Sequence, residues 1–216
     1  MLAEYICMKD ALITGGSSGL GYELSKLLIN DFNITNLSRT PSDLSVRNIK
    51  IDLSNSKKLK NVISKLSSEN FSLLVLNAGS IHWRKIGEIP YEEIDTDFKI
   101  NITNMIKITN GLVTQIIKNN GTIIVIGSTA AYNTHDGGSV YTSSKYAVKG
   151  FIEALQHDLK NTKVRILGLH PSGFESNLHV KGGMSRKNKN RPKSNEISNR
   201  VYKIYSSNTR FTNKII

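Results

Sequence analysis

The sequence predicts an α/β fold in which a doubly wound, parallel sheet of about seven strands lies between two layers of helices. Short apolar runs alternate along the chain with longer segments whose apolar residues recur every three to four positions. The apolar runs, such as 73–76 and 122–127, are rich in Ile, Val and Leu, which is typical of strands covered on both faces. This alternation favours right-handed βαβ units and hence a parallel sheet.

The expected elements follow one another without an internal repeat or a proline-rich linker. Because 216 residues suit one core, we expect a single domain over residues 1–216, with 1–8 as an N-terminal extension. Ser54 is the expected N-cap of the second helix. The expected strands cover 10–14, 33–37, 46–51, 73–76, 122–127, 163–169 and 210–216. The expected helices cover 19–31, 54–68, 91–118, 141–159 and 197–206.

Composition narrows the class of protein. The longest apolar runs are far too short to cross a bilayer, and the N-terminus lacks the pattern of a secretory signal. The single cysteine, Cys7, has no partner within the chain for a disulfide. No group of His, Cys and Asp has the spacing of metal ligands. We therefore expect a cytoplasmic protein with no membrane association and no bound metal.

The net charge of +12 is concentrated near the C-terminus. Residues 177–216 contain ten of the 29 Lys and Arg residues and a single acid, Glu196. A basic segment attracts nucleic acid or phosphorylated and acidic substrates, although a solvated polar face is the simpler interpretation. No nucleic-acid-binding motif accompanies the charge, so no specific nucleic-acid partner is expected. The long polar segment 177–195 is interpreted as a substrate-binding loop or lid, and its order is left open.

A glycine-rich turn joins the first strand to the first helix. Its sequence is TGGSSGLG over residues 14–21. Glycines permit a tight turn and let backbone N–H groups approach a diphosphate, while the following helix directs its positive N-terminus at the same charge. This turn predicts a binding site for a dinucleotide at the carboxyl end of the first strand.

A tyrosine and a lysine form the candidate acid/base group. Tyr141 and Lys145 are four residues apart in YTSSK, which puts them on one helix face, one turn apart. Tyrosine ordinarily ionises near pH 10. A neighbouring ammonium favours the phenolate, so we expect Lys145 to lower the pKa of Tyr141.

Together these motifs resemble those of the short-chain dehydrogenase/reductase family, and the resemblance runs from about residue 10 to residue 216. Asp52 follows the third strand and is similar to the aspartate that contacts the adenine ring in this family. Asn77, Ala78 and Gly79 resemble the NAG motif that closes the fourth strand. The resemblance implies a Rossmann-like fold and a nicotinamide cofactor.

The resemblance also implies roles for four catalytic residues. Ser128 lies 13 residues before Tyr141, as the family serine does, and its hydroxyl would donate to the substrate oxygen. Asn101 is similar to the asparagine that holds a proton-relay water, with Asn104 as the alternative. Tyr141 would be the acid/base, and Lys145 would lower its pKa and hold the nicotinamide ribose. His170 is expected to be structural, because Tyr141 already fills the acid/base role.

The second strand ends at Ser38, Arg39 and Thr40, without the acid that hydrogen-bonds the ribose 2′-hydroxyl in NAD-dependent relatives. Arg39 is suited to bind a 2′-phosphate instead, which favours NADP(H) over NAD(H). The segment after the sixth strand is expected to pack along the nicotinamide. The expected cofactor-binding residues are Gly15, Ser17, Ser18, Gly19, Leu20, Gly21, Ser38, Arg39, Asp52, Leu53, Asn77, Ala78, Gly79, Tyr141, Lys145, Pro171, Phe174 and Ser176.

The sequence therefore predicts an NADP(H)-dependent oxidoreductase that transfers a hydride between the nicotinamide and a carbonyl or secondary alcohol carbon. The polar, basic segment 177–195 favours a small substrate that is acidic or phosphorylated. A catalytically silent NADP(H)-binding sensor and a nucleotide-sugar-modifying enzyme are the alternatives. We expect a homodimer or homotetramer that associates through the long helices at 91–118 and 141–159.

Overall fold

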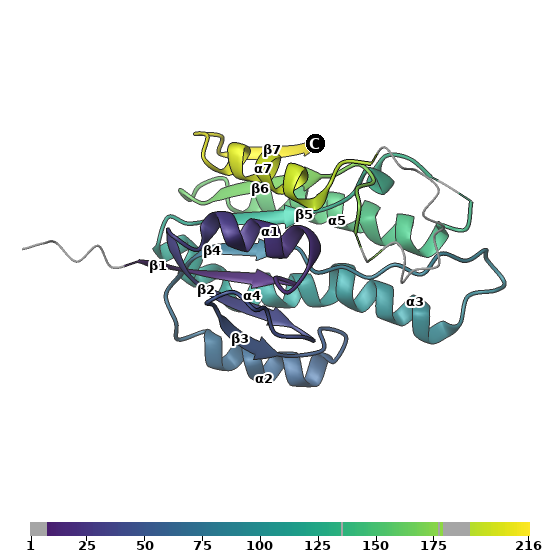
Figure 1. The fold of residues 1–216 in the computed structure, drawn as a ribbon, viewed down its shortest axis with the longest axis horizontal. Helices are drawn as coiled ribbons and strands as arrows, with labels where there is room; N and C mark the ends of the chain where they lie inside the picture. The colour runs from purple at the N-terminus through teal and green to yellow at the C-terminus, as the bar shows by residue number, and fades with distance from the viewer. Residues whose placement is uncertain (1–7, 135, 177, 179–190) are drawn as a thin grey trace, which may run out of the picture.

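The computed structural model describes residues 8–134, 136–176, 178 and 191–216. Within this part of the chain, seven parallel strands form one sheet with the order β3-β2-β1-β4-β5-β6-β7 (Figure 1). The strands are β1 (Lys9–Thr14), β2 (Phe32–Ser38), β3 (Arg47–Lys50), β4 (Phe71–Leu76), β5 (Thr122–Ile126), β6 (Arg165–His170) and β7 (Phe211–Ile215). The chain winds outward from β1 to β3 and then returns to β4 beside β1. This is the doubly wound, Rossmann-like arrangement that the sequence predicts.

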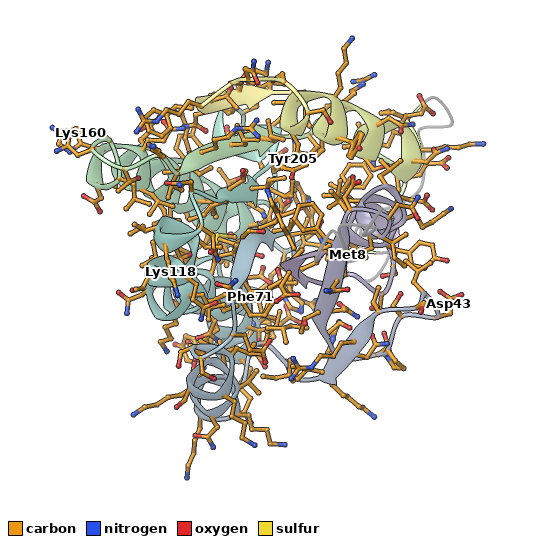
Figure 2. All side chains as sticks on the ribbon, turned by 90° about the vertical axis from the view of Figure 1, so that its left-hand side faces the viewer. Met8, Asp43, Phe71, Lys118, Lys160 and Tyr205 are labelled. Atoms are coloured by element: carbon orange, nitrogen blue, oxygen red, sulfur yellow. The ribbon has the colours of Figure 1, made fainter. Side chains whose placement is uncertain are left out.

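Helices cover both faces of the sheet. α1 and α7 pack against each other on one face, while α2, α4 and α5 cover the other. Figure 2 looks along the strands from their amino ends, where Met8 and Phe71 lie, and shows the helices on either side. The helices are α1 (Gly19–Leu28), α2 (Ser56–Leu66), α3 (Tyr91–Phe98), the π-helix η1 (Lys99–Thr103), α4 (Asn104–Lys118), the 3-10 helix η2 (Thr129–Ala131), α5 (Ser139–Asp158) and α7 (Ser194–Tyr205).

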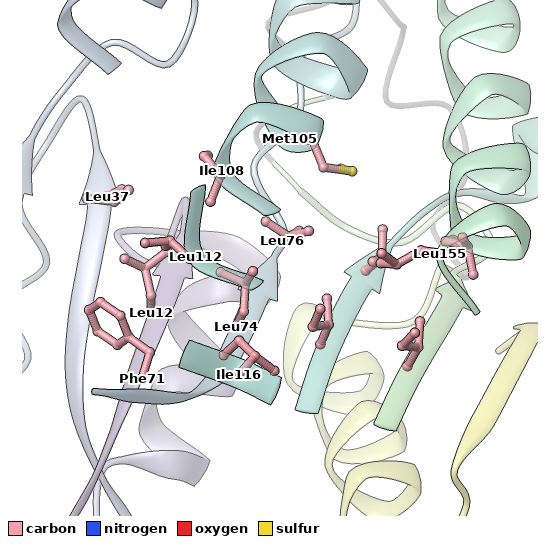
Figure 3. Packing of buried hydrophobic residues seen from close by; sticks show 14 of the residues in the cluster. Leu12, Leu37, Phe71, Leu74, Leu76, Met105, Ile108, Leu112, Ile116 and Leu155 are labelled. Atoms are coloured by element: carbon pink, nitrogen blue, oxygen red, sulfur yellow. The ribbon is translucent and has the colours of Figure 1, made fainter. Parts of the chain in front are cut away.

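Each face of the sheet has its own apolar core because successive strand residues point to opposite sides. Leu74 belongs to the core beneath α2, α4 and α5, whereas its neighbours Leu73 and Val75 belong to the core beneath α1 and α7. Figure 3 shows Leu74 beside Leu112 and Ile116 of α4. Burial on both faces accounts for the uninterrupted apolar strand sequences.

Two elements differ from the sequence-based expectation. The N-cap of α2 is Asn55 rather than Ser54, since the side chain of Asn55 accepts a hydrogen bond of 3.0 Å from the backbone N–H of Lys58. The hydroxyl of Ser54 instead donates to Asp52 at 2.8 Å. The helix expected over 91–118 is interrupted by η1, whose extra residue per turn changes the helix face at Asn101.

The carboxyl ends of the strands position the functional motifs. In a parallel sheet these ends lie along one edge, and the glycine turn, Asp52, Asn77, Ser128 and the segment after β6 all follow a strand there. None of the helices in the described part of the chain combines the length and apolar character that a membrane crossing requires.

Candidate active site

The glycine turn between β1 and α1 has the backbone shape that a diphosphate cradle needs. Gly15 and Gly19 have φ angles of +71° and +57°, which side-chain-bearing residues seldom adopt. Gly21, an expected cofactor-binding residue, is not among the residues that line the cleft over the strand ends. A Cβ at Gly21 would come within 2.4 Å of both the Asn77 side-chain nitrogen and the Gly15 carbonyl oxygen. Its missing side chain therefore lets α1 approach the ends of β1 and β4.

Asn36, a buried residue of β2, supports the turn from below. Its side-chain oxygen accepts a 2.9 Å hydrogen bond from the backbone N–H of Gly16, and its amide nitrogen donates to Ser38 at 2.9 Å. The hydroxyl of Thr40 donates to that of Ser17 at 3.1 Å. These bonds join the glycine turn to the end of β2. Sequence reasoning missed Asn36, because an asparagine inside an apolar strand carries no motif.

A cleft of about 410 Å³ runs over the strand ends. The cleft, the left-handed glycines and the N-terminus of α1 together fit a dinucleotide. Fourteen of the expected cofactor-binding residues line it: Gly15, Ser17, Ser18, Gly19, Leu20, Ser38, Arg39, Asp52, Leu53, Asn77, Ala78, Gly79, Phe174 and Ser176. Leu37, Thr40, Ile51, Ile100 and Leu178 also line it and were not expected.

Two polar residues of the cleft, Asp52 and Asn77, are held in place by hydrogen bonds. Asp52 accepts bonds from the backbone N–H of Ser54 at 2.9 Å and from its hydroxyl at 2.8 Å. These bonds hold the pKa of the Asp52 carboxyl below its usual value, so it is ionised near neutral pH. Asn77 donates to the carbonyl of Thr14 at 3.0 Å, and its backbone N–H donates to the Thr14 hydroxyl at 3.0 Å. Thr14 and Asn77 thus fasten the ends of β1 and β4 together.

Tyr141 and Lys145 lie on one face of α5, as the spacing predicts. The ammonium nitrogen of Lys145 is 5.5 Å from the centroid of the Tyr141 ring. Both residues are buried, with exposures of 4% for Lys145 and 7% for Tyr141. Ser128 follows β5, and its side chain hydrogen-bonds to that of Tyr141. The Ser128 oxygen also accepts a 3.1 Å bond from the backbone N–H of Ala130, which fixes its direction.

Asn101 belongs to this group and Asn104 does not. The amide nitrogen of Asn101 donates to the Ser80 carbonyl and the Ser144 hydroxyl, both at 2.9 Å. A Cβ built on Gly79 would lie 3.4 Å from the Asn101 oxygen and 3.8 Å from the Lys145 nitrogen, so both side chains flank this glycine. Asn104 instead donates to the carbonyl of Leu53 at 2.6 Å.

His170, at the end of β6, is buried directly behind Ser128. One ring nitrogen, Nε2, lies 2.6 Å from the side-chain oxygen of Asn213, whose amide nitrogen in turn donates to Glu153 at 3.1 Å. Nε2 is therefore the donor. Burial lowers the pKa of His170, so the ring is neutral. With the hydrogen on Nε2, Nδ1 accepts the 3.3 Å bond from the backbone N–H of Ser128 and cannot donate to the Ser128 carbonyl oxygen, which lies 3.2 Å away. Gly127 leaves room for the ring, since a Cβ there would lie 2.3 Å from Nδ1.

The pKa of Tyr141 is raised, whereas the sequence-based expectation is that Lys145 lowers it. Burial raises it to about 12, although the hydrogen bond to Ser128 acts in the opposite direction. Burial also lowers the pKa of Lys145 to about 8. Removing both groups from water disfavours their charged forms, and burial is the largest cause of both shifts. Tyr141 is therefore a protonated phenol at neutral pH.

The remaining expected site residues lie beside the cleft or outside the described part. Tyr141, Lys145 and Pro171 do not line the cleft itself, and the Pro171 carbonyl accepts a 3.1 Å bond from the backbone N–H of Thr129. Of the expected lid, 177 and 179–190 lie outside the described residues, and its last two residues begin α7. No group of potential metal ligands occurs among the residues that the structure describes.

A doubly wound parallel sheet with a glycine turn and a cleft along its carboxyl edge defines the class of dinucleotide-binding α/β proteins. Within that class, the chain matches the short chain dehydrogenase family over residues 9–186. The chain therefore belongs to the short-chain dehydrogenase family, whose members are oxidoreductases that use a nicotinamide dinucleotide.

Individual relatives are distant. The NADP-dependent 3-hydroxy acid dehydrogenase of Schizosaccharomyces pombe is 29% identical in an alignment of 191 positions that covers 80% of this chain and 74% of the relative. The 1,2-dihydroxy-1,2-dihydronaphthalene dehydrogenase of Pseudomonas putida is 27% identical over 77% of this chain and 70% of its own. A solved short chain dehydrogenase family protein from Francisella tularensis has the same fold, with a TM-score of 0.86, 24% identity and coverage of 97% of this chain and 96% of that one.

Proposed function

We propose that this protein is an NADP(H)-dependent oxidoreductase that transfers a hydride between the nicotinamide and a carbonyl or secondary alcohol carbon. The observation that carries the proposal is the grouping of Tyr141, Lys145 and Ser128 beside the cleft, with Tyr141 and Lys145 buried. A catalytically silent sensor has no need of this grouping. A nucleotide-sugar-modifying enzyme is the other alternative.

In the reductive direction a bound nicotinamide cofactor supplies the hydride. Tyr141 holds a proton up to high pH and donates it to the substrate oxygen as negative charge develops there. Ser128 donates a second hydrogen bond to the same oxygen and so stabilises that charge. In this proposal Lys145 binds the nicotinamide ribose hydroxyls. Asn101 orders the backbone at Ser80 beside this group through two hydrogen bonds.

Three features support NADP(H) over NAD(H). Arg39 lines the cleft at the end of β2, where no acid is present to repel a 2′-phosphate. The hydroxyls of Ser17 and Thr40 line the same part of the cleft and add donors for a phosphate. The relative in Schizosaccharomyces pombe is named as NADP-dependent.

We propose a small substrate with an acidic or phosphorylated group. The charge of the C-terminal segment and the name of the 3-hydroxy acid dehydrogenase support this choice. The immediate surroundings of Tyr141 are apolar, with Ile81, Trp83, Ala130 and Leu178 packed around it. These apolar side chains suit contact with the carbon atoms next to the carbonyl. The acidic group of the substrate would then lie further from Tyr141.

The test is NADPH consumption with a panel of 3-oxo acids, phosphorylated ketones, simple ketones and aldehydes. We expect turnover with at least one 3-oxo acid or phosphorylated ketone. Tyr141→Phe should lose this turnover by a factor of about 10² to 10⁴ while still binding NADPH. Tyr146→Phe, on the exposed side of the same helix, is the matched control and should keep it. NADPH binding without turnover of any substrate would favour the sensor.

We also propose that the chain forms a homodimer through α4 and α5. Ile106 and Ile117 of α4 and Tyr146 of α5 are exposed apolar side chains on these two helices. Exposed large apolar side chains are typical of contact surfaces when a partner covers them. Sedimentation analysis distinguishes the dimer from a monomer or a homotetramer.

A further inference from the structure

Two opposite charges are buried in this protein, and they lie on helices that pack together. Among the described residues, Asp97 is the only buried Asp or Glu and Lys145 the only buried Lys or Arg, with exposures of 0% and 4%. Asp97 lies on α3 and Lys145 on α5, and these helices are in contact. A lone buried charge is costly, so two opposite ones in neighbouring helices point to mutual compensation. No direct salt bridge within 4 Å joins them in the described part of the chain.

Among the described residues, His82 is the hydrogen-bond partner of the Asp97 side chain. One carboxylate oxygen accepts a 2.8 Å bond from Nδ1 of the His82 ring, and the other accepts a 3.1 Å bond from the His82 backbone N–H. This geometry requires a hydrogen on Nδ1 when Asp97 is ionised. Glu93 also acts on His82, but its carboxylate is engaged by Arg84 at 2.6 and 2.9 Å.

The carboxylate of Asp97 acts electrostatically on the catalytic group. Asp97 lies four residues before Asn101, where α3 continues into η1, and the side chains of Asn101 and Lys145 both flank Gly79. Electrostatic attraction to Asp97 raises the pKa of Lys145 against the effect of burial. Repulsion from the same charge contributes to the raised pKa of Tyr141. Both effects favour the protonated form of the group concerned.

We propose that Asp97, oriented by His82, is the buried counter-charge of Lys145 and a positioning residue that keeps both the ammonium of Lys145 and the phenol of Tyr141 protonated. The inference rests on the proposed function, because a protonated phenol is the form that donates to a substrate oxygen during reduction. Asp97 touches neither substrate nor cofactor in this account. It acts through the charge states of the two residues that do.

The test needs neither substrate nor cofactor. In the full chain labelled with ¹³C-lysine, the Cε signal of Lys145 is followed by NMR across pH and assigned by its loss in Lys145→Met. The parent midpoint is expected near pH 8. Asp97→Asn keeps the shape of the side chain and removes its charge, so the midpoint should shift to lower pH. Asp97→Glu keeps the charge and should hold the midpoint close to the parent value.

The matched control is Asp95→Asn, which removes an exposed carboxylate from the same helix and should leave the midpoint unchanged. An unshifted or raised midpoint in Asp97→Asn overturns the inference. If Asp97→Asn fails to fold, the double variant Asp97→Asn/Lys145→Met should fold, since no lone charge stays buried, and failure of the double variant also overturns the inference. The proposed function fails separately, through NADPH turnover that survives in Tyr141→Phe.

Discussion

Replacing Gly21 by alanine tests whether the close approach of α1 to the strand ends holds the glycine turn together. The added methyl carbon would lie 2.4 Å from the Gly15 carbonyl oxygen and 2.4 Å from the Asn77 nitrogen, well inside contact distance. One of these atoms belongs to the backbone and cannot rotate away. Overpacking of this kind costs up to about 3 kcal/mol, and the better helix propensity of alanine returns about 1 kcal/mol.

The net loss for Gly21→Ala is therefore about 2 kcal/mol. For a chain of this size, each kcal/mol corresponds to roughly 2–4 °C in Tm, so calorimetry should show a fall of roughly 4–8 °C. Gly150→Ala is the matched control, because Gly150 also lies within a helix but a Cβ there meets no atom within 4 Å. That variant gains only the propensity, about 1 kcal/mol, and its Tm should rise by roughly 2–4 °C.

The clash in Gly21→Ala should also displace Gly15. Because Gly15 lines the cleft, this displacement should weaken NADPH binding. Fluorescence titration of NADPH with both variants measures this effect, and Gly150→Ala should bind as the parent does. Equal Tm values and equal NADPH affinities for the two variants would refute the packing role assigned to Gly21.

Three other changes test separate parts of the site. Arg39→Ala should weaken NADPH binding by roughly 10- to 150-fold, because it loses about 1.5–3 kcal/mol from a hydrogen bond to a charged group, and should leave NADH binding little changed in the same fluorescence titration. Equal losses of affinity for NADPH and NADH would contradict the 2′-phosphate assignment. Burial holds the pKa of His170 below its ordinary value near 6.5, so the unfolded chain takes up this proton first as the pH falls. Stability should therefore be complete above about pH 6.5 and decline below it, and His170→Gln should reduce that decline in urea unfolding measured at a series of pH values; an identical decline in both proteins would refute the neutral ring. Ile106→Glu combined with Tyr146→Glu should convert the proposed dimer to a monomer in sedimentation analysis, and an unchanged dimer would place the interface elsewhere.

The sequence was sufficient for the fold because local patterns and long-range packing agree along most of the chain. The central strands, such as β4, have nearly unbroken apolar sequences because both of their faces are buried. The glycine turn, the NAG segment and the tyrosine–lysine pair were also recognisable, because backbone conformation or helical spacing limits which residues occupy them. The π-helix at Asn101 was not predictable, since its geometry depends on the packing of α3 and α5.

Contacts between distant segments explain what sequence reasoning missed in the site. His82 and Asp97 carry no motif, and only the fold brings the loop after β4 against α3. The contact of His170 with Ser128 depends on the pairing of β5 with β6 and on the absence of a side chain at Gly127. The pKa of Tyr141 was misjudged because spacing reveals the neighbouring ammonium and not the depth at which both groups are buried.

The most direct measurement is a crystal structure of the protein with NADP⁺. We expect the pyrophosphate to lie on the turn of Gly15 and Gly19, Arg39 to contact the 2′-phosphate, and the nicotinamide to face the phenol oxygen of Tyr141. A dinucleotide bound with its nicotinamide turned away from Tyr141, or bound outside the cleft, would contradict it.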